Sequence, residues 1–135
     1  MSYSIDEIEG IGPTYAGKLK AVGISTTEAY LERAKDPKGR KALAEETGID
    51  DKRILKWANM ADLMRISGVG EEYSELLEAA GVDTVKELKH RNAANLAEKM
   101  KEVNEEKKLV RQVPGESSVE KWVEQAKTLA PMMTY

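Results

Sequence analysis

The residues whose spacing best suits chemistry are Gly10 and Gly12, which flank the apolar Ile11. Two glycines so close together permit a tight turn with backbone conformations that a Cβ atom would obstruct. Pro13 follows where a helix would begin, a position at which its missing N–H sacrifices no hydrogen bond. The unpaired N–H groups and the partial positive charge of such a helix start predict a corner that can bind an anion such as phosphate.

Charged side chains of both signs surround this corner. Lys18 and Lys20 lie in the helix expected after it, and Glu7 and Glu9 precede it. The lysines would favour a bound phosphate, whereas the glutamates would oppose it. Two interpretations therefore stay open, an anion site and a purely structural turn.

The same pattern recurs at Gly68, Val69 and Gly70, but different charges follow it. Glu71 and Glu72 open the next expected helix, where acidic side chains interact favourably with the helix dipole. They would also repel phosphate from the amides that should bind it. We therefore expect the second turn to be a structural joint.

Residues with catalytic spacing are not evident. His90 is the only histidine and stands between Lys89 and Arg91. The chain has no cysteine, which excludes disulfides and thiolate metal sites. The acidic pair Asp50 and Asp51 does not suit a calcium loop, which needs alternating oxygen ligands and a closing Glu. Asp50 is better interpreted as the cap of a helix that starts near Lys52. We expect no enzymatic activity, no cofactor and no metal site.

An internal repeat positions both turns. Residues of the first half recur 58 positions later: Gly10, Gly12, Tyr15, Leu19, Gly23 and Thr26 match Gly68, Gly70, Tyr73, Leu77, Gly81 and Thr84. Lys56-Trp57 then matches Lys121-Trp122 at the longer offset of 65. We expect the repeated Tyr and Trp residues to pack in the core of each half rather than to stack on nucleic-acid bases.

Helix boundaries are indicated by capping residues. Four Ser or Thr residues stand three positions before a Glu and predict capping boxes, namely Ser4 with Glu7, Ser25 with Glu28, Thr84 with Glu87, and Ser117 with Glu120. Gly23, Gly48 and Gly81 predict left-handed helix ends. We expect about ten or eleven short helices, one longer helix over Ile54–Ile66 that leads into the second turn, and no sheet.

The charge balance limits the possible partners. The net charge is −3 and the pI about 5.4, which disfavours a protein that coats nucleic acid non-specifically. Residues 1–67 are neutral overall, so the first half is the better candidate for phosphate contact. Basic residues in 35–41 could extend such a face, although a charged loop is the simpler interpretation. No apolar run is long enough to cross a membrane and the N-terminus does not look like a signal peptide, so we expect a cytoplasmic protein.

The segment Ile8–Leu19, followed by Gly23-Ile24, resembles the helix-hairpin-helix superfamily, whose members often grip duplex DNA through its backbone. The resemblance implies phosphate contact by the amides of Gly10–Gly12, with Thr14 and Lys18 at positions that often carry polar or basic residues. More widely, the segments 68–73, 76–82, 113–115 and 119–127 resemble the family called domain of unknown function 4332. Each half also resembles small five-helix modules of recombinases and polymerase subunits, which contact DNA or dock proteins.

These observations predict an all-α fold of two tandem helix-hairpin-helix modules, which are SAM-like five-helix units that share a long central helix. The modules would span residues 1–66 and 67–135 and pack rigidly together. One hypothesis is a non-catalytic protein that binds duplex DNA weakly and without sequence preference. Its contact residues would be Gly10, Ile11, Gly12, Thr14, Lys18 and Lys20.

The alternative is a protein-interaction or adaptor module that binds no DNA. It is favoured by the acidic balance, by the glutamates after the second turn, and by the apolar groups in residues 130–135. Methionines there would adapt well to a partner surface if they were exposed. A frayed terminus is the competing interpretation of this segment.

Overall fold

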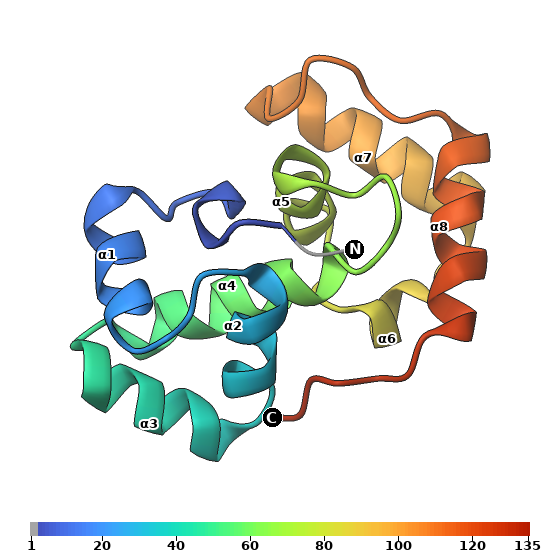
Figure 1. The fold of residues 1–135 in the computed structure, drawn as a ribbon. Coiled ribbons are helices and arrows are strands. Elements are labelled where there is room, and N and C mark those ends of the chain that lie inside the picture. The colour runs from blue at the N-terminus through green and yellow to red at the C-terminus, as the bar shows by residue number, and fades with distance from the viewer. Residues whose placement is uncertain (1–2) are drawn as a thin grey trace.

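The computed structural model describes residues 3–135, which form eight α-helices and one 3₁₀-helix (Figure 1). Their bounds are η1 Ile5–Glu7, α1 Pro13–Ala21, α2 Thr27–Ala34, α3 Pro37–Thr47, α4 Asp51–Leu63, α5 Glu71–Ala79, α6 Val85–Leu88, α7 Ala93–Lys107 and α8 Glu116–Thr128. No strand forms among these residues, where a single isolated bridge pairs Ser4 with Thr26. The all-α prediction is confirmed, with fewer helices than expected.

Of the four predicted capping boxes, the one at Ser4 forms, and two helices begin elsewhere. Thr84 caps α6, but the Glu87 carboxylate accepts from the N–H of Asp83 and not from that of Thr84, so this box is incomplete. The backbone N–H of Ser4 donates to the Glu7 carboxylate at 2.8 Å, and Thr84 Oγ1 accepts from the Glu87 N–H at 3.3 Å. The prediction that Ser25 caps a helix is wrong, because α2 is capped one residue later by Thr26. The carbonyl of Ser25 instead accepts from the N–H of Ile5 in a tertiary contact.

The last helix also begins earlier than expected. Gly115 is the N-cap of α8, so Ser117 lies inside the helix instead of capping it. The left-handed conformation expected at three glycines is present, with φ of +86° at Gly23, +72° at Gly48 and +97° at Gly81.

The longer central helix exists but is displaced toward the N-terminus. It spans Asp51–Leu63 instead of Ile54–Ile66, because a series of tight turns replaces its last residues. In these turns the N–H of Ile66 donates to Leu63 O and the N–H of Val69 donates to Ile66 O, both at 3.1 Å. The turns carry the chain from one hydrophobic cluster into the other.

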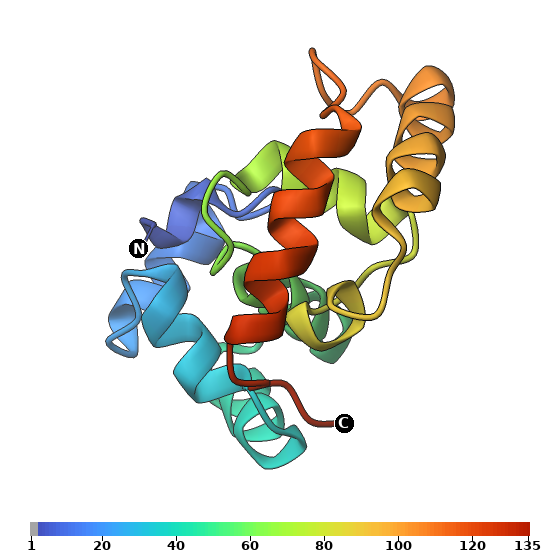
Figure 2. The ribbon, with the colours of Figure 1, turned by 90° about the vertical axis from the view of Figure 1, so that its right-hand side faces the viewer.

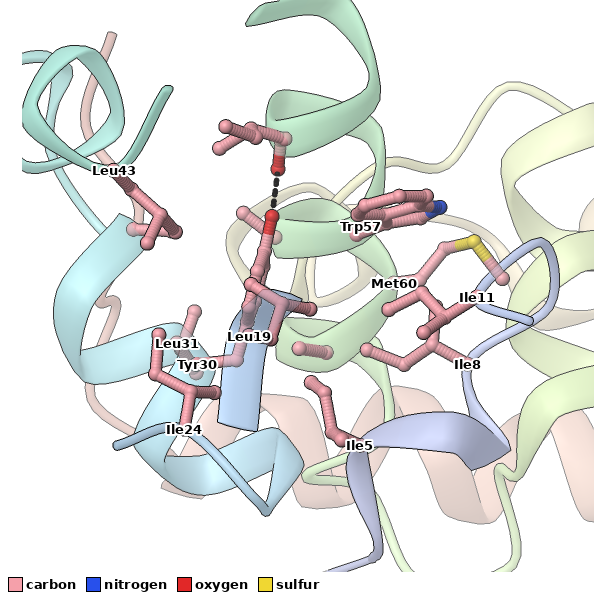
Figure 3. Close-up of a cluster of buried hydrophobic side chains, with 14 of the residues drawn as sticks. Ile5, Ile8, Ile11, Leu19, Ile24, Tyr30, Leu31, Leu43, Trp57 and Met60 are labelled. Atoms are coloured by element: carbon pink, nitrogen blue, oxygen red, sulfur yellow. Dashed lines mark hydrogen bonds between the residues drawn. The ribbon is translucent and has the colours of Figure 1, made fainter. Parts of the chain in front are cut away.

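Two hydrophobic clusters lie on either side of this junction (Figures 1 and 2). The first is built by η1, α1 to α3 and most of α4, and the second by the end of α4 and by α5 to α8. Within the first cluster, Ile11 inserts beside Ile8 and Met60, and the Tyr30 hydroxyl donates to Ile54 O at 2.7 Å (Figure 3). The clusters hold the two glycine turns, Gly10–Gly12 and Gly68–Gly70, through Ile11 and Val69.

The C-terminal segment, Leu129–Tyr135, extends from α8 back to the first cluster, where the chain ends beside α2 and α3 (Figure 1). Met133 is only 6% exposed and belongs to that cluster. The expectation of an exposed apolar or frayed terminus is therefore wrong for Met133. The physical reason is that its backbone neighbour Thr134 is hydrogen-bonded to the carbonyl of Lys35 at 2.8 Å.

Candidate functional site

The first glycine turn is fixed by packing at one glycine and left open at the other. Gly10 has a φ of +97°, and a Cβ there would lie 3.3 Å from Nε1 of Trp57. Gly12 has an extended backbone, and a Cβ there would meet nothing within 4 Å. The fold therefore requires glycine at position 10, whereas at position 12 glycine leaves free space in front of the helix start.

The backbone amides at the start of α1 are unpaired. Gly12 is the N-cap of α1 and provides no side-chain cap, and Pro13 at the first helical position has no N–H to donate. Within residues 3–135, no acceptor bonds to the N–H of Gly12, Thr14 or Tyr15. The dipole of α1 adds partial positive charge at the same place. An anion could satisfy these amides as a capping side chain would.

The two predicted lysines lie on different sides of α1. Lys20 lines a shallow hollow of about 460 Å³ together with Gly12 and Pro13. Asp6 lines the same hollow, and a hydrogen bond from Ser4 lowers the pKa of its carboxyl group, with a smaller contribution from Lys20. The carboxylate opposes any anion that enters, so the hollow carries one cation and one acid.

Lys18 lies with a second cation on the other side. Its Nζ is 5.9 Å from the ring centroid of Tyr15, and the guanidinium of Arg53 is 5.6 Å from the same centroid. The ring itself packs edge-on against Trp57, with centroids 5.1 Å apart. Sequence reasoning missed Arg53, because only the packing of α4 against α1 brings it to the first turn.

The second glycine turn has the same backbone. Gly68 has a φ of +89° and a Cβ there would lie 3.4 Å from Nε1 of Trp122, while a Cβ on Gly70 would meet nothing within 4 Å. Tyr73 packs against Trp122 with centroids 5.3 Å apart. The expected packing of the repeated Tyr and Trp residues is thus present at both turns.

The charges around the second turn are acidic, and some of them come from the first half. Its hollow of about 330 Å³ is lined by Glu7, Glu71 and Glu72 beside Tyr3 and Tyr73. Desolvation raises the pKa of Glu71, with further contributions from Glu9, Glu72 and Glu7. Desolvation likewise raises the pKa of Glu75, and Glu9 adds to the effect. Glu7 and Glu9 therefore raise pKa values on α5. We call the group of Glu7, Glu9, Glu71, Glu72 and Glu75 the acidic corner.

The repeat offsets show how the two turns differ. Lys18 and Lys20 correspond to the buried Leu76 and to Glu78 at the offset of 58, and Arg53 corresponds to Ser118 at the offset of 65. All three cations near the first turn are thus replaced in the second half.

The remaining candidates do not assemble into a site. The basic stretch in 35–41 forms no continuous phosphate-binding face, because Lys35 pairs with Glu32 at 2.8 Å and Arg40 is buried. His90 is exposed in the turn after α6. Across residues 3–135 no three His, Asp or Glu side chains are grouped so that they could hold a metal ion. No helix in that range is both long and apolar enough to cross a membrane.

A family model described as Domain of unknown function (DUF4332) matches residues 9–129. Because the match covers most of the chain, the protein belongs to this family, as its sequence segments indicated. No curated protein and no solved structure matches the chain significantly.

Proposed function

We propose that the protein binds the backbone of duplex DNA through the first glycine turn, without catalysis and without sequence preference. In this proposal the amides of Gly12, Thr14 and Tyr15 contact phosphate oxygens, and Lys18, Lys20 and Arg53 add positive charge. The observation that carries it is the contrast between two turns of equal backbone, of which only the first has cations around its open glycine.

We also propose that the two glycine turns are the hairpins of tandem helix-hairpin-helix modules, spanning residues 1–66 and 67–135. Matching positive φ at Gly10 and Gly68, matching Tyr–Trp contacts and the constant offset of 58 support this interpretation. The Glu-rich second module would then serve as a joint and not as a second DNA grip.

The affinity should be modest. Two or three phosphate contacts correspond to a slope of about −2 to −3 in log K against log salt concentration. The net charge of −3 and the carboxylate of Asp6 oppose approach to DNA. We expect dissociation constants of tens of micromolar, on the order of non-specific DNA binding, and only at low salt.

The test is a titration of a fluorescently labelled duplex with the full chain at several salt concentrations, followed by anisotropy. The proposal predicts equal affinity for unrelated sequences and the shallow salt slope given above. Absence of any anisotropy change at about 100 μM protein in low salt would rule it out, since non-specific binders reach half-saturation below that concentration.

A second candidate function, docking of a basic protein partner, is favoured by the acidic corner. Burial and mutual repulsion raise the pKa values of Glu71 and Glu75, so a positive partner surface would relieve an existing electrostatic cost. Cross-linking the chain in a native lysate, with and without Glu71→Gln and Glu75→Gln, distinguishes this function. A partner that is lost on substitution supports docking, whereas the same set of cross-links from both chains contradicts it.

A further inference from the structure

The C-terminal segment is held by specific contacts, and most of its partners lie in the first half of the chain. Both backbone polar groups of Thr134 are used, because its N–H donates to Lys35 O at 2.8 Å and its carbonyl accepts from Arg40 Nη2 at 2.7 Å. The Tyr135 hydroxyl donates to Asn59 Oδ1 at 2.6 Å. Recognition of one residue through both of its backbone groups is how proteins bind extended peptides.

Side chains add selectivity to this backbone recognition. Met133 enters the first hydrophobic cluster and is 6% exposed. The guanidinium of Arg40 lies 5.5 Å from the ring centroid of Tyr135, donates to Ala34 O at 2.9 Å as well as to Thr134, and is buried. Burying a charged guanidinium is costly unless it is hydrogen-bonded. The carbonyl of Thr134 in the bound segment supplies one of the acceptors that Arg40 needs.

The surface that receives the segment belongs to α2, α3 and α4, and we call it the α2–α4 groove. It comprises Ala34 and Lys35 at the end of α2, Arg40 of α3 and Asn59 of α4. The segment itself follows α8, a helix of the second cluster whose C-terminal end lies close to the junction between the halves (Figures 1 and 2). The groove therefore belongs to the first half of the chain, and the segment that occupies it belongs to the second half.

The connection between them is short, with Ala130 and Pro131 exposed and Leu129 and Met132 only partly buried. Residues 129–132 are not helical, and one hydrogen bond from Arg65 Nη2 to Ala130 O, at 2.7 Å, attaches them to the turn after α4. A hollow of about 290 Å³ remains between Leu129 and Met132 on one side and Leu31 and Met64 on the other. The anchoring contacts are thus concentrated in Met133–Tyr135.

We propose that the α2–α4 groove is a peptide-binding site that takes Met133–Tyr135 of a second copy of the chain whenever its own segment is released. Within one chain the connection supplies a local concentration on the order of millimolar, so the chain's own segment wins at ordinary concentrations. Release exposes groove and peptide together, which allows exchange between copies.

Two full-length variants test the exchange by complementation. Met133→Asp places a charge in the cluster and releases the segment while it leaves the groove intact. Arg40→Met combined with Asn59→Ala removes the groove's side-chain donor and side-chain acceptor while it leaves the segment intact. Each variant closes on itself more weakly than the unsubstituted chain, and the groove of the first can receive the segment of the second.

The measurement is an NMR titration of ¹⁵N-labelled Met133→Asp chain with the unlabelled groove variant. We expect saturable shifts at the amides of Lys35, Arg40 and Asn59, with a dissociation constant on the order of 1 mM or below. The control is a chain that carries all three substitutions, which has neither groove nor segment and should cause no shifts. Circular dichroism of each variant shows that it is folded.

Two outcomes overturn the proposal. One is the absence of saturable shifts at the groove up to about 2 mM of folded groove variant. The other is an equal response to the triple variant, which would mean non-specific contact. If Met133→Asp fails to fold, Thr134→Pro replaces it, because it removes the N–H that donates to the Lys35 carbonyl and restricts the backbone of the segment without placing a charge in the cluster. The inference is independent of DNA binding, and no nucleic acid is present in the test.

Discussion

Gly12 allows folding and ligand binding to be separated by one substitution. Its extended backbone and the free space around its Cβ position suit an N-cap side chain. We expect Gly12→Asp to leave the free energy of unfolding unchanged or to raise it by a few tenths of a kcal/mol. The added carboxylate would occupy the amides of α1 and weaken duplex binding by about tenfold or more. Urea unfolding and anisotropy measure the two effects separately.

The matched control is Gly70→Asp, because Gly70 has the same N-cap position and the same free space in the second turn. Its effect on duplex binding should stay within about twofold, as expected of a charge remote from the contact. If the two variants weaken binding equally, net charge and not the first turn governs the interaction.

Arg53 tests the contact that only the structure revealed. We expect Arg53→Ser, which installs the residue found at the equivalent position 118, to weaken duplex binding and to reduce the salt slope by about one. Lys101→Ser on the exposed side of α7 makes a comparable charge change away from the turn and should leave the slope unchanged. An unchanged slope for Arg53→Ser would remove Arg53 from the site.

The limits of sequence reasoning at this scale are physical. The glycine spacing predicted a tight turn that a Cβ would obstruct, and the structure has the positive φ at Gly10 and Gly68 but an extended backbone at Gly12 and Gly70. Lys18 and Lys20 could be named because they follow the turn locally. Arg53 could not, because its position depends on how α4 packs against α1, and no local pattern encodes that packing.

Among the elements, α5 and the segment around η1 bring acidic side chains close together, with Glu71 and Glu75 on α5 near Glu9. Burial, and then repulsion from neighbouring glutamates, raises the pKa values of Glu71 and Glu75 in the folded chain above their ordinary value of 4.5. A carboxyl group with a raised folded pKa destabilises the fold fully above that pKa and ceases to do so once it is protonated. The acidic corner should therefore cost stability at pH 7 and less at pH 5.

We thus expect the free energy of unfolding to rise between pH 7 and pH 5, by no more than about 1 kcal/mol because these side chains are largely solvated. Chains with Glu71→Gln and Glu75→Gln should start higher at pH 7 and show a smaller rise. Urea titrations at both pH values measure this. Equal slopes for the two chains would mean that other groups cause the pH dependence.

Helix boundaries show which elements the sequence could locate. The start of α1 and the glycine ends of α3 and of the helices before Gly23 and Gly81 followed from local signals. The start of α2 did not, because the N–H of Thr27 donates to Tyr3 O at 2.8 Å and this distant pairing selects Thr26 as the cap. Short-range capping rules cannot include a partner so far away along the sequence.

At the scale of the molecule, the C-terminal segment links the second half to the first. Arg65 joins Asp62 at 2.8 Å to Ala130 O at 2.7 Å, and Arg40 joins α3 to Thr134. The methionines suggested a partner surface, yet in the fold they cover the chain itself. The exchange between copies would turn that same self-contact into an intermolecular one.

The stability of this link can be compared with that of the core. Truncation of a buried Leu or Met to Ala costs about 2–5 kcal/mol when the whole fold must absorb the cavity. We expect that cost for Leu43→Ala, a fully buried residue of α3 in the first cluster. For Met133→Ala we expect only about 1–2 kcal/mol, because the segment can detach while the rest stays folded, which limits the loss.

Hydrogen exchange distinguishes local detachment from global unfolding. In Met133→Ala the N–H of Thr134 should exchange faster, while the amides of α4 keep their protection, because they leave the folded state only in global opening. In Leu43→Ala the exchange of the Thr134 N–H and the exchange of the α4 amides should accelerate together. If Met133→Ala instead accelerates α4 as strongly as Leu43→Ala does, the segment opens only with the whole fold. A segment that cannot leave by itself could not be exchanged between copies, so this result would also contradict the peptide-binding role of the α2–α4 groove.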